Sequence, residues 1–249
     1  MPKYRQTDIS PRNIMSIPSD TRYFGDISPK YHDIFLLAHT RPNIAYAVSV
    51  VNQFIHDPKE IHLQVMYQIL QYLKGTPGKG ILFKKEEKLT LEAYTDANYA
   101  RFVVDKRSIS GYSTYLGHNL VTWRSKKQNV MARSSAEAKF RSMVLGICEL
   151  LWLKIILEDL KITWETPMRL YCDNKSAINI AHNPIQHDRT KHNEVARHFI
   201  KEKLDNGLIC TPFLSTKRQL ADVLTKGLST ATFQTIVGKL GMKNIHSST

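Results

Sequence analysis

The sequence predicts an α/β fold, in which a mixed five-stranded sheet carries helices on its faces and follows a small helical segment. Three observations predict it. Two stretches with apolar residues at helical spacing come first, and short segments with strand-like alternation begin near residue 90. Strands and helices then alternate through the rest of the chain, which is typical of helices packed on a sheet.

The composition favours a soluble, basic protein. Of 249 residues, 42% are hydrophobic and 23% are charged, and 35 Lys and Arg against 22 Asp and Glu give a net charge of +13. Such an excess favours a nucleic-acid partner, although a merely basic, solvated surface is the alternative. The three cysteines lie far apart, and neither a secretory leader nor a membrane-spanning run is recognisable. We therefore expect an intracellular location, cytoplasmic or nuclear, and no membrane partner.

The first third of the chain divides into two parts. Residues 1–33 are polar and interrupted by prolines, which predicts little order. Residues 34–87 predict two amphipathic helices. The first lies in "TRPNIAYAVSVVNQFI", with Pro42 in its first turn, and the second lies in "HDPKEIHLQVMYQILQYLKGTPGKG" and ends at Gly75. Because two such helices make a poor core alone, we expect them to pack on a neighbour.

Residues 88–242 predict the α/β domain, and residues 243–249 a C-terminal tail. "LTLEAYTDAN" alternates as a half-buried strand does, and "GYSTYLG" and "LVTWRSKK" predict two strands joined as a hairpin. A long helix is expected from Ser134 to about Leu160. The remaining elements follow in order: strand "MRLYCDN", helix "KSAINIAH", helix "TKHNEVARHFIKEKLDNG", strand "LICTPF" and a last helix around "KRQLADVLTKG".

Three aspartates occupy positions where strands end or the last helix begins: Asp96, Asp173 and Asp222. Carboxylates at such positions can converge on one edge of a sheet. Phosphodiester hydrolysis by two Mg²⁺ ions uses a cluster of this kind, because Mg²⁺ prefers oxygen ligands. Each aspartate alone could equally be a turn or cap residue.

The stretch from about Leu89 to Met242 resembles the ribonuclease H domain of copia-type LTR-retrotransposon Pol polyproteins. The motifs that carry the resemblance include "YTDANYA", "VTWRSKKQ", "ARSSAEA", "LYCDNKSAINIAHNP" and "LADVLTK". Residues 34–87 resemble the segment that joins reverse transcriptase to ribonuclease H. No YxDD-type polymerase motif is present, and the poor match of residues 1–33 to polymerase suggests a truncated copy.

The resemblance implies an RNase H-like fold and hydrolysis of the RNA strand of RNA/DNA hybrids, with two Mg²⁺ ions for which Mn²⁺ can substitute. It also implies nucleic acid and the rest of the Pol polyprotein as partners. Asp96, Asp173 and Asp222 match three of the family's four metal-binding carboxylates. Lys139 stands where the family has the fourth, a Glu. The expected activity is therefore impaired, and an inactive nucleic-acid-binding module or a non-functional relic is the alternative.

Glu137 is the candidate substitute for the missing Glu. Ser134 and Glu137 form a capping-box pattern, in which Glu137 would bond the Ser134 backbone N–H. Positions 137 and 139 are about 200° apart around a helix, so Glu137 is poorly placed for the metal site.

The segment "WRSKKQ" interleaves an aromatic with cations, and it predicts contact with a phosphate backbone or sugar, although a solvated strand end is the alternative. We assign nucleic-acid binding to Trp123, Arg124, Lys126, Lys127 and Asn174. Four histidines raise the question of a zinc site, but their spacing and the lack of a nearby Cys favour surface or nucleic-acid-facing roles. They are His182, His187, His192 and His198.

Overall fold

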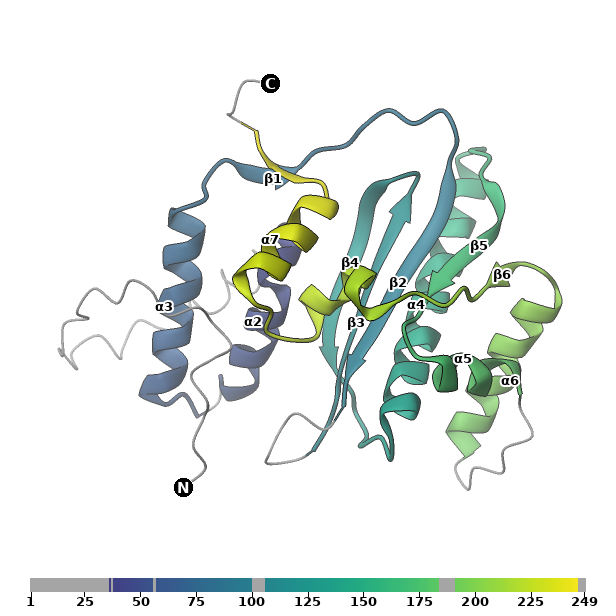
Figure 1. Cartoon of the computed structure of the whole chain (residues 1–249), viewed down its shortest axis with the longest axis horizontal. Helices are drawn as coiled ribbons and strands as arrows, with labels where there is room; N and C mark the ends of the chain where they lie inside the picture. Colours follow the sequence, from purple (N-terminus) through teal and green to yellow (C-terminus); the bar gives the residue numbers. More distant parts are fainter. Residues whose placement is uncertain (1–35, 37, 56, 100–105, 184–190, 246–249) are drawn as a thin grey trace.

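A five-stranded sheet forms the centre of the molecule (Figure 1). The computed structural model describes residues 36, 38–55, 57–99, 106–183 and 191–245, with backbone only at 191–194. The predicted low order of residues 1–33 lies outside this range. The strands are β2 (Thr90–Asn98), β3 (Ile109–Leu116), β4 (Asn119–Lys127), β5 (Glu165–Tyr171) and β6 (Ile209–Cys210).

The sheet order is β4-β3-β2-β5-β6. β2, β3 and β4 pair antiparallel, whereas β5 lies parallel to β2 and β6 lies parallel to β5. Gly117, at φ +59, forms the tight turn between β3 and β4. This order confirms the predicted mixed sheet and is the arrangement of an RNase H-like domain.

One face of the sheet is covered by α4 (Ser135–Asp159), and α5 (Lys175–His182) and α6 (Lys191–Asp205) lie beside α4 (Figure 1). The buried face of α4 includes Phe140, Met143 and Ile147, which pack in one cluster with residues of β2 and β5. This helix begins where the sequence predicts, since Ser134 is its N-cap.

The opposite side carries the helical segment that precedes the sheet. The elements of this side are η2 (Pro42–Ile44), α2 (Ala45–Val51), η3 (Asn52–Phe54), α3 (Glu60–Lys74) and the late helix α7 (Thr230–Lys239). Ala45 shares an apolar cluster with Leu120 of the sheet and Val237 of α7. The indole N–H of Trp123 also donates to the Ala38 carbonyl over 3.0 Å. The expectation that these helices need a neighbour is confirmed.

Three features differ from the sequence prediction, and one of them is helix α7, which was not predicted. The predicted helix around "KRQLADVLTKG" is wrong as an α-helix, because its place is taken by two 3₁₀ turns, η4 (Thr216–Arg218) and η5 (Leu220–Leu224). A second, two-stranded sheet was not predicted, in which β1 (Lys79–Ile81) pairs antiparallel with β7 (Met242–Asn244). This ribbon connects the end of the helical segment to the end of the chain.

Candidate functional site

Asp96 lies near the end of β2, and its side chain is 1% exposed. The turn η5 approaches Asp96 from the side of the sheet opposite α4. It can do so because the residue paired with Asp96 on β3 is Gly111, which has no side chain. A Cβ on Gly111 would lie 2.6 Å from Thr225 Cγ2 and 2.8 Å from Leu224 Cβ. The missing side chain therefore lets this turn approach the strand, and the Thr225 hydroxyl donates a hydrogen bond to Asp96 Oδ2.

Asp173 and Asp222 complete the cluster from two other elements. Asp173 follows β5, which lies parallel to β2, and its Oδ2 accepts a 3.0 Å hydrogen bond from the Thr216 hydroxyl of η4. Asp222 lies within η5 and is buried. The structure therefore brings the three predicted aspartates to one edge of the sheet.

Two lysines lie among these carboxylates. Lys139, in the first turns of α4, places its Nζ 3.0 Å from Asp96 Oδ1 and also pairs with Asp173 Oδ1. Lys226 places its Nζ 2.8 Å from Asp222 Oδ1 and 3.6 Å from Asp96 Oδ2. Three carboxylates and two ammonium groups thus alternate through the cluster.

The electrostatics of the cluster follow from burial and from these contacts. Burial and the nearby charge of Asp96 raise the pKa of Asp222 to about 7. Burial alone would also raise the pKa of Asp96, but the adjacent Lys139 and Lys226 outweigh it and lower that pKa. Burial opposes the charged form of Lys139, yet Asp96 and Asp173 raise its pKa above the ordinary value. Lys139 therefore remains an ammonium at neutral pH.

Glu137 lies in the first turn of α4, and its contacts are with residues near the start of this helix. The Ser134 hydroxyl accepts a 3.1 Å hydrogen bond from the Glu137 backbone N–H. Glu137 Oε2 accepts from the backbone N–H of Arg133 over 2.8 Å, whereas the sequence predicted a bond from the Ser134 backbone N–H. Its Oε1 lies 2.6 Å from a guanidinium nitrogen of Arg141. The carboxylate is thus engaged at the start of α4 by groups outside the cluster.

Whether the cluster suits a divalent metal can be judged from its donors. Three carboxylates are suitable ligands for Mg²⁺. Asp96 Oδ1 is buried without a hydrogen-bond partner, but the Lys139 ammonium occupies the space in front of it. Within the described residues, no three His, Cys, Asp or Glu side chains are arranged to hold a metal ion. The residues present therefore do not fit a pair of Mg²⁺ ions.

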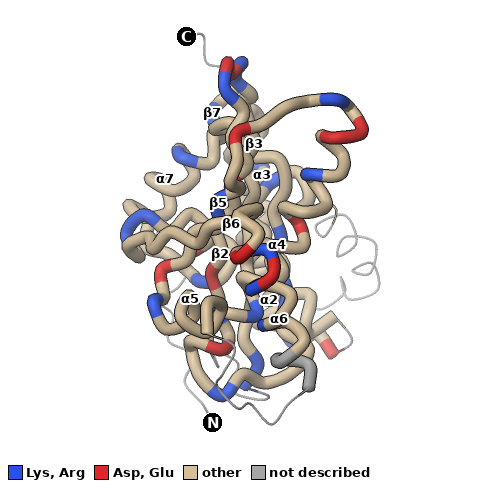
Figure 2. Tube along the Cα trace, turned by 90° about the vertical axis from the view of Figure 1, so that its right-hand side faces the viewer, with Lys and Arg blue, Asp and Glu red and all other residues tan. Residues whose placement is uncertain are grey.

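Four of the predicted nucleic-acid residues lie together on β4, whereas Asn174 lies apart from them at the start of α5. Trp123 faces the helical segment through its bond to Ala38, and Asn174 caps α5 by accepting from the Ala177 backbone N–H over 2.8 Å. Arg124 and Lys126 are exposed on β4, and Lys127 is half-buried there. Figure 2 shows Lys and Arg positions spread over many elements of the trace. Basic charge is therefore not confined to the β4 segment.

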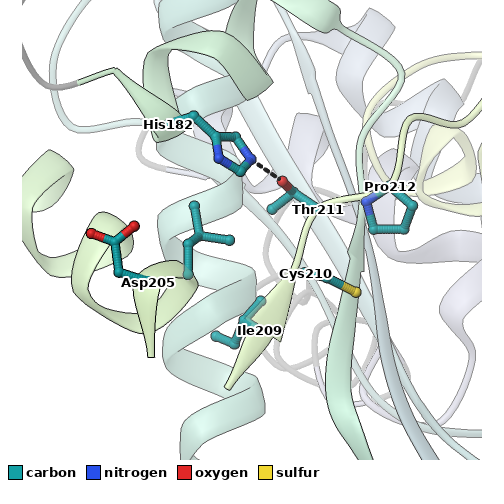
Figure 3. A pocket seen from close by; sticks show the side chains of 7 residues that line it. His182, Asp205, Ile209, Cys210, Thr211 and Pro212 are labelled. Atoms are coloured by element: carbon teal, nitrogen blue, oxygen red, sulfur yellow. Dashed lines mark hydrogen bonds between the residues drawn. The ribbon is translucent and has the colours of Figure 1, made fainter. Parts of the chain in front are cut away.

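A separate hollow lies between the end of α5, the end of α6 and β6 (Figure 3). His182 and the Thr211 hydroxyl are hydrogen-bonded across it at 2.8 Å. None of the three aspartates of the cluster lines this hollow. His198 is exposed, whereas His187 and the side chain of His192 lie outside the described residues.

The sequence prediction missed three residues of the cluster: Lys226, Thr225 and Thr216. The spacing of Lys226 four residues after Asp222 is a weak local signal for an ion pair. The two threonines give no such signal, because their acceptors lie more than forty residues away.

The mixed five-stranded sheet and its helices form an RNase H-like α/β domain, and the relatives of the chain give its family. The Pol polyprotein of transposon RE1 from Arabidopsis thaliana is 43% identical over 212 residues, which are 85% of this chain and 14% of that protein. The Pol polyprotein of transposon RE2 from the same plant is 39% identical over 232 residues, or 93% of this chain and 16% of that protein. No family model matches the sequence.

The chain belongs to the retrovirus-related Pol polyproteins of copia-type transposons, and it spans only 14–16% of the length of these two relatives. Among solved structures, the N-terminal RNase H domain of rv2228c from Mycobacterium tuberculosis, solved as a fusion with maltose-binding protein, is 11% identical with a TM-score of 0.38. The match covers 61% of this chain and 98% of that one. Over the described residues, no helix is both long and apolar enough to cross a membrane.

Proposed function

We propose that this chain is a ribonuclease H domain that binds RNA/DNA hybrids, and that Lys139 blocks its hydrolysis of the RNA strand. The family and the positions of Asp96, Asp173 and Asp222 support the domain assignment. The single observation that carries the block is the Lys139 ammonium, which pairs with both Asp96 and Asp173.

The physical reason is the charge of Lys139. Two Mg²⁺ ions, held by carboxylates, would supply an activated water and stabilise the leaving oxygen in this type of hydrolysis. At about 4 Å and an effective dielectric constant near 20, each pair of like unit charges costs ~4 kcal/mol. An ammonium among the ligands therefore opposes a divalent ion strongly, and Glu137 is held elsewhere by Arg133 and Arg141.

The test is binding and cleavage of a labelled RNA/DNA hybrid in Mg²⁺ and in Mn²⁺. We expect the parent chain to bind the hybrid without cutting it and Lys139→Glu to cut it. The double variant Lys139→Glu/Asp173→Asn serves as the control and should not cleave the hybrid. Cleavage by the parent that Asp173→Asn abolishes would contradict the block, whereas failure of the parent to bind the hybrid would contradict the domain assignment.

A further inference from the structure

Phe213 is an exposed aromatic residue beside the carboxylate cluster. Its side chain is 50% exposed, although it belongs to a well-anchored stretch just after β6. Its backbone forms a parallel bridge with Cys172, and the next residue, Leu214, donates from its N–H to the Cys172 carbonyl over 2.9 Å. Cys172 immediately precedes Asp173, so the backbone of Phe213 is held next to the strand that leads to this carboxylate.

One cation lies near this ring, and two more lie on the turn that follows it in the chain. Lys175 Nζ lies 5.1 Å from the ring centroid, a distance at which an ammonium is attracted to the π face. Lys217 and Arg218 are exposed on η4, the turn that also supplies Thr216 to Asp173. Within the described part of the chain, Lys175, Lys217 and Arg218 form no ion pair with a carboxylate, so their charges are available to an anion.

The lysines of the cluster are in a different situation. Lys139 and Lys226 are both bound to buried aspartates. Lys175, Lys217 and Arg218 have no carboxylate partner among the described residues, so they can contact a phosphate. An open aromatic ring bordered by unpaired cations has the chemistry that single-stranded nucleic acid recognises, because bases stack on aromatic rings while phosphates meet Lys and Arg.

We infer that Phe213, with Lys175, Lys217 and Arg218, forms a nucleotide-stacking subsite for an unpaired nucleotide of the bound nucleic acid. Phe213 takes the base, and the three cations take the flanking phosphates. This inference rests on the proposed function, since it names the part of the surface that grips the strand. The Cys172 bridge already holds the backbone of Phe213, so little conformational entropy of this segment is lost on binding.

The test uses the full chain and two fluorescent RNA/DNA hybrids, one blunt and one with an unpaired RNA tail. Phe213→Ala should weaken binding of the tailed hybrid about 5- to 150-fold and leave its salt dependence unchanged. Phe213→Trp should bind the tailed hybrid about as tightly as the parent does, because it keeps an aromatic ring. Lys175→Ala should instead reduce the slope of log K against log salt by about 1.

Trp152→Ala is the matched control. Trp152 is 52% exposed and lies on α4 thirteen residues beyond Lys139, which is about 20 Å along the helix. It should bind both hybrids as the parent does. If the parent binds the tailed hybrid and Phe213→Ala binds it equally well, the subsite is overturned while the proposed function stands. If the parent binds neither hybrid, both proposals fall.

Discussion

Lys139 joins two aspartates of the carboxylate cluster. Its ammonium lies against two buried aspartates that would otherwise repel each other, and its side chain is only 12% exposed. A buried charge of this kind stabilises the fold through its partners, because the loss of one partner leaves the others uncompensated. Lys139 therefore acts as an internal counter-ion for Asp96 and Asp173.

Removal of the Lys139 ammonium should destabilise the folded protein in the absence of metal. We predict that Lys139→Ala lowers the free energy of unfolding by about 3–5 kcal/mol in EDTA at neutral pH, because Asp96 and Asp173 lose their shared partner. Lys154→Ala is the control, since Lys154 pairs with the half-exposed Glu158 on the surface of α4. It should cost less than about 1 kcal/mol. Equal losses in chemical denaturation would show that the position of Lys139 confers no special stability.

At the scale of the elements, close approach between α4 and the sheet depends on Gly146. A Cβ there would lie 2.5 Å from Thr95 Cγ2 and 2.9 Å from Leu170 Cδ1. This contact holds the start of α4, and with it Lys139, against the strand that carries Asp96. Gly111 has the same role for η5 on the other face of the sheet.

We predict that Gly146→Ala destabilises the protein by about 1–2 kcal/mol, because overpacking outweighs the better helix propensity of alanine. Gly238→Ala in α7 provides the comparison, since nothing lies within 4 Å of a Cβ built there. It should stabilise by up to about 1 kcal/mol. The measurement is the denaturation midpoint of both variants, and stabilisation by Gly146→Ala would show that α4 is free to move away from the sheet.

The elements that the sequence predicts well are those with long local patterns. β2 and α4 show alternation or helical spacing over nine and twenty-five residues. The 3₁₀ turn η5 and the ribbon of β1 and β7 depend on distant contacts instead. Gln219 bonds the Thr95 carbonyl over 3.1 Å, and the residues of β1 pair with partners more than 150 positions away. Helix α7 is rich in Thr, Ile and Val, which weakens its local helix signal.

The candidate site divides in the same way. The positions of Asp96, Asp173 and Asp222 at element ends, together with the family resemblance, were visible in the sequence, but their metal-binding role stays a prediction. The ion pairs of Lys139 and Lys226 were not visible, because they depend on how α4 and η5 meet across the sheet. The nucleic-acid role of Trp123 also stays a prediction, and its indole N–H is engaged by Ala38.

At the scale of the whole molecule, the helical segment and the sheet share apolar and polar contacts. One apolar cluster joins Ala45, Tyr115 and Leu224 from three parts of the chain. The Ser49 and Ser125 hydroxyls are hydrogen-bonded over 3.0 Å between α2 and β4. Tyr94 and Tyr115 belong to this apolar cluster, and Tyr112 donates a hydrogen bond to Glu149 of α4. The stability of the fold should therefore fall at alkaline pH.

Burial raises the pKa of Tyr94 to about 12, and it raises the pKa of Tyr112 and Tyr115 further. Because the folded-state pKa exceeds the unfolded value of about 10, stability is fully present below about pH 10 and is lost as pH rises above it. We therefore predict that the urea midpoint falls as the pH rises from about 10 to about 12. The near-ultraviolet absorbance of tyrosinate should rise together with unfolding. Tyrosine ionisation in the still-folded protein would contradict this prediction.

The block by Lys139 is tested most directly by the Mg²⁺ dependence of unfolding, measured for the parent and for Lys139→Glu at matched ionic strength. We expect Mg²⁺ to leave the parent midpoint unchanged, because Lys139 already neutralises the cluster. Lys139→Glu should be less stable than the parent in EDTA and should gain about 2.7 kcal/mol at a Mg²⁺ concentration one hundred times its Kd. Addition of Asp173→Asn should weaken that gain. A saturable stabilisation of the parent by Mg²⁺ would contradict the block, since the metal would then bind beside Lys139.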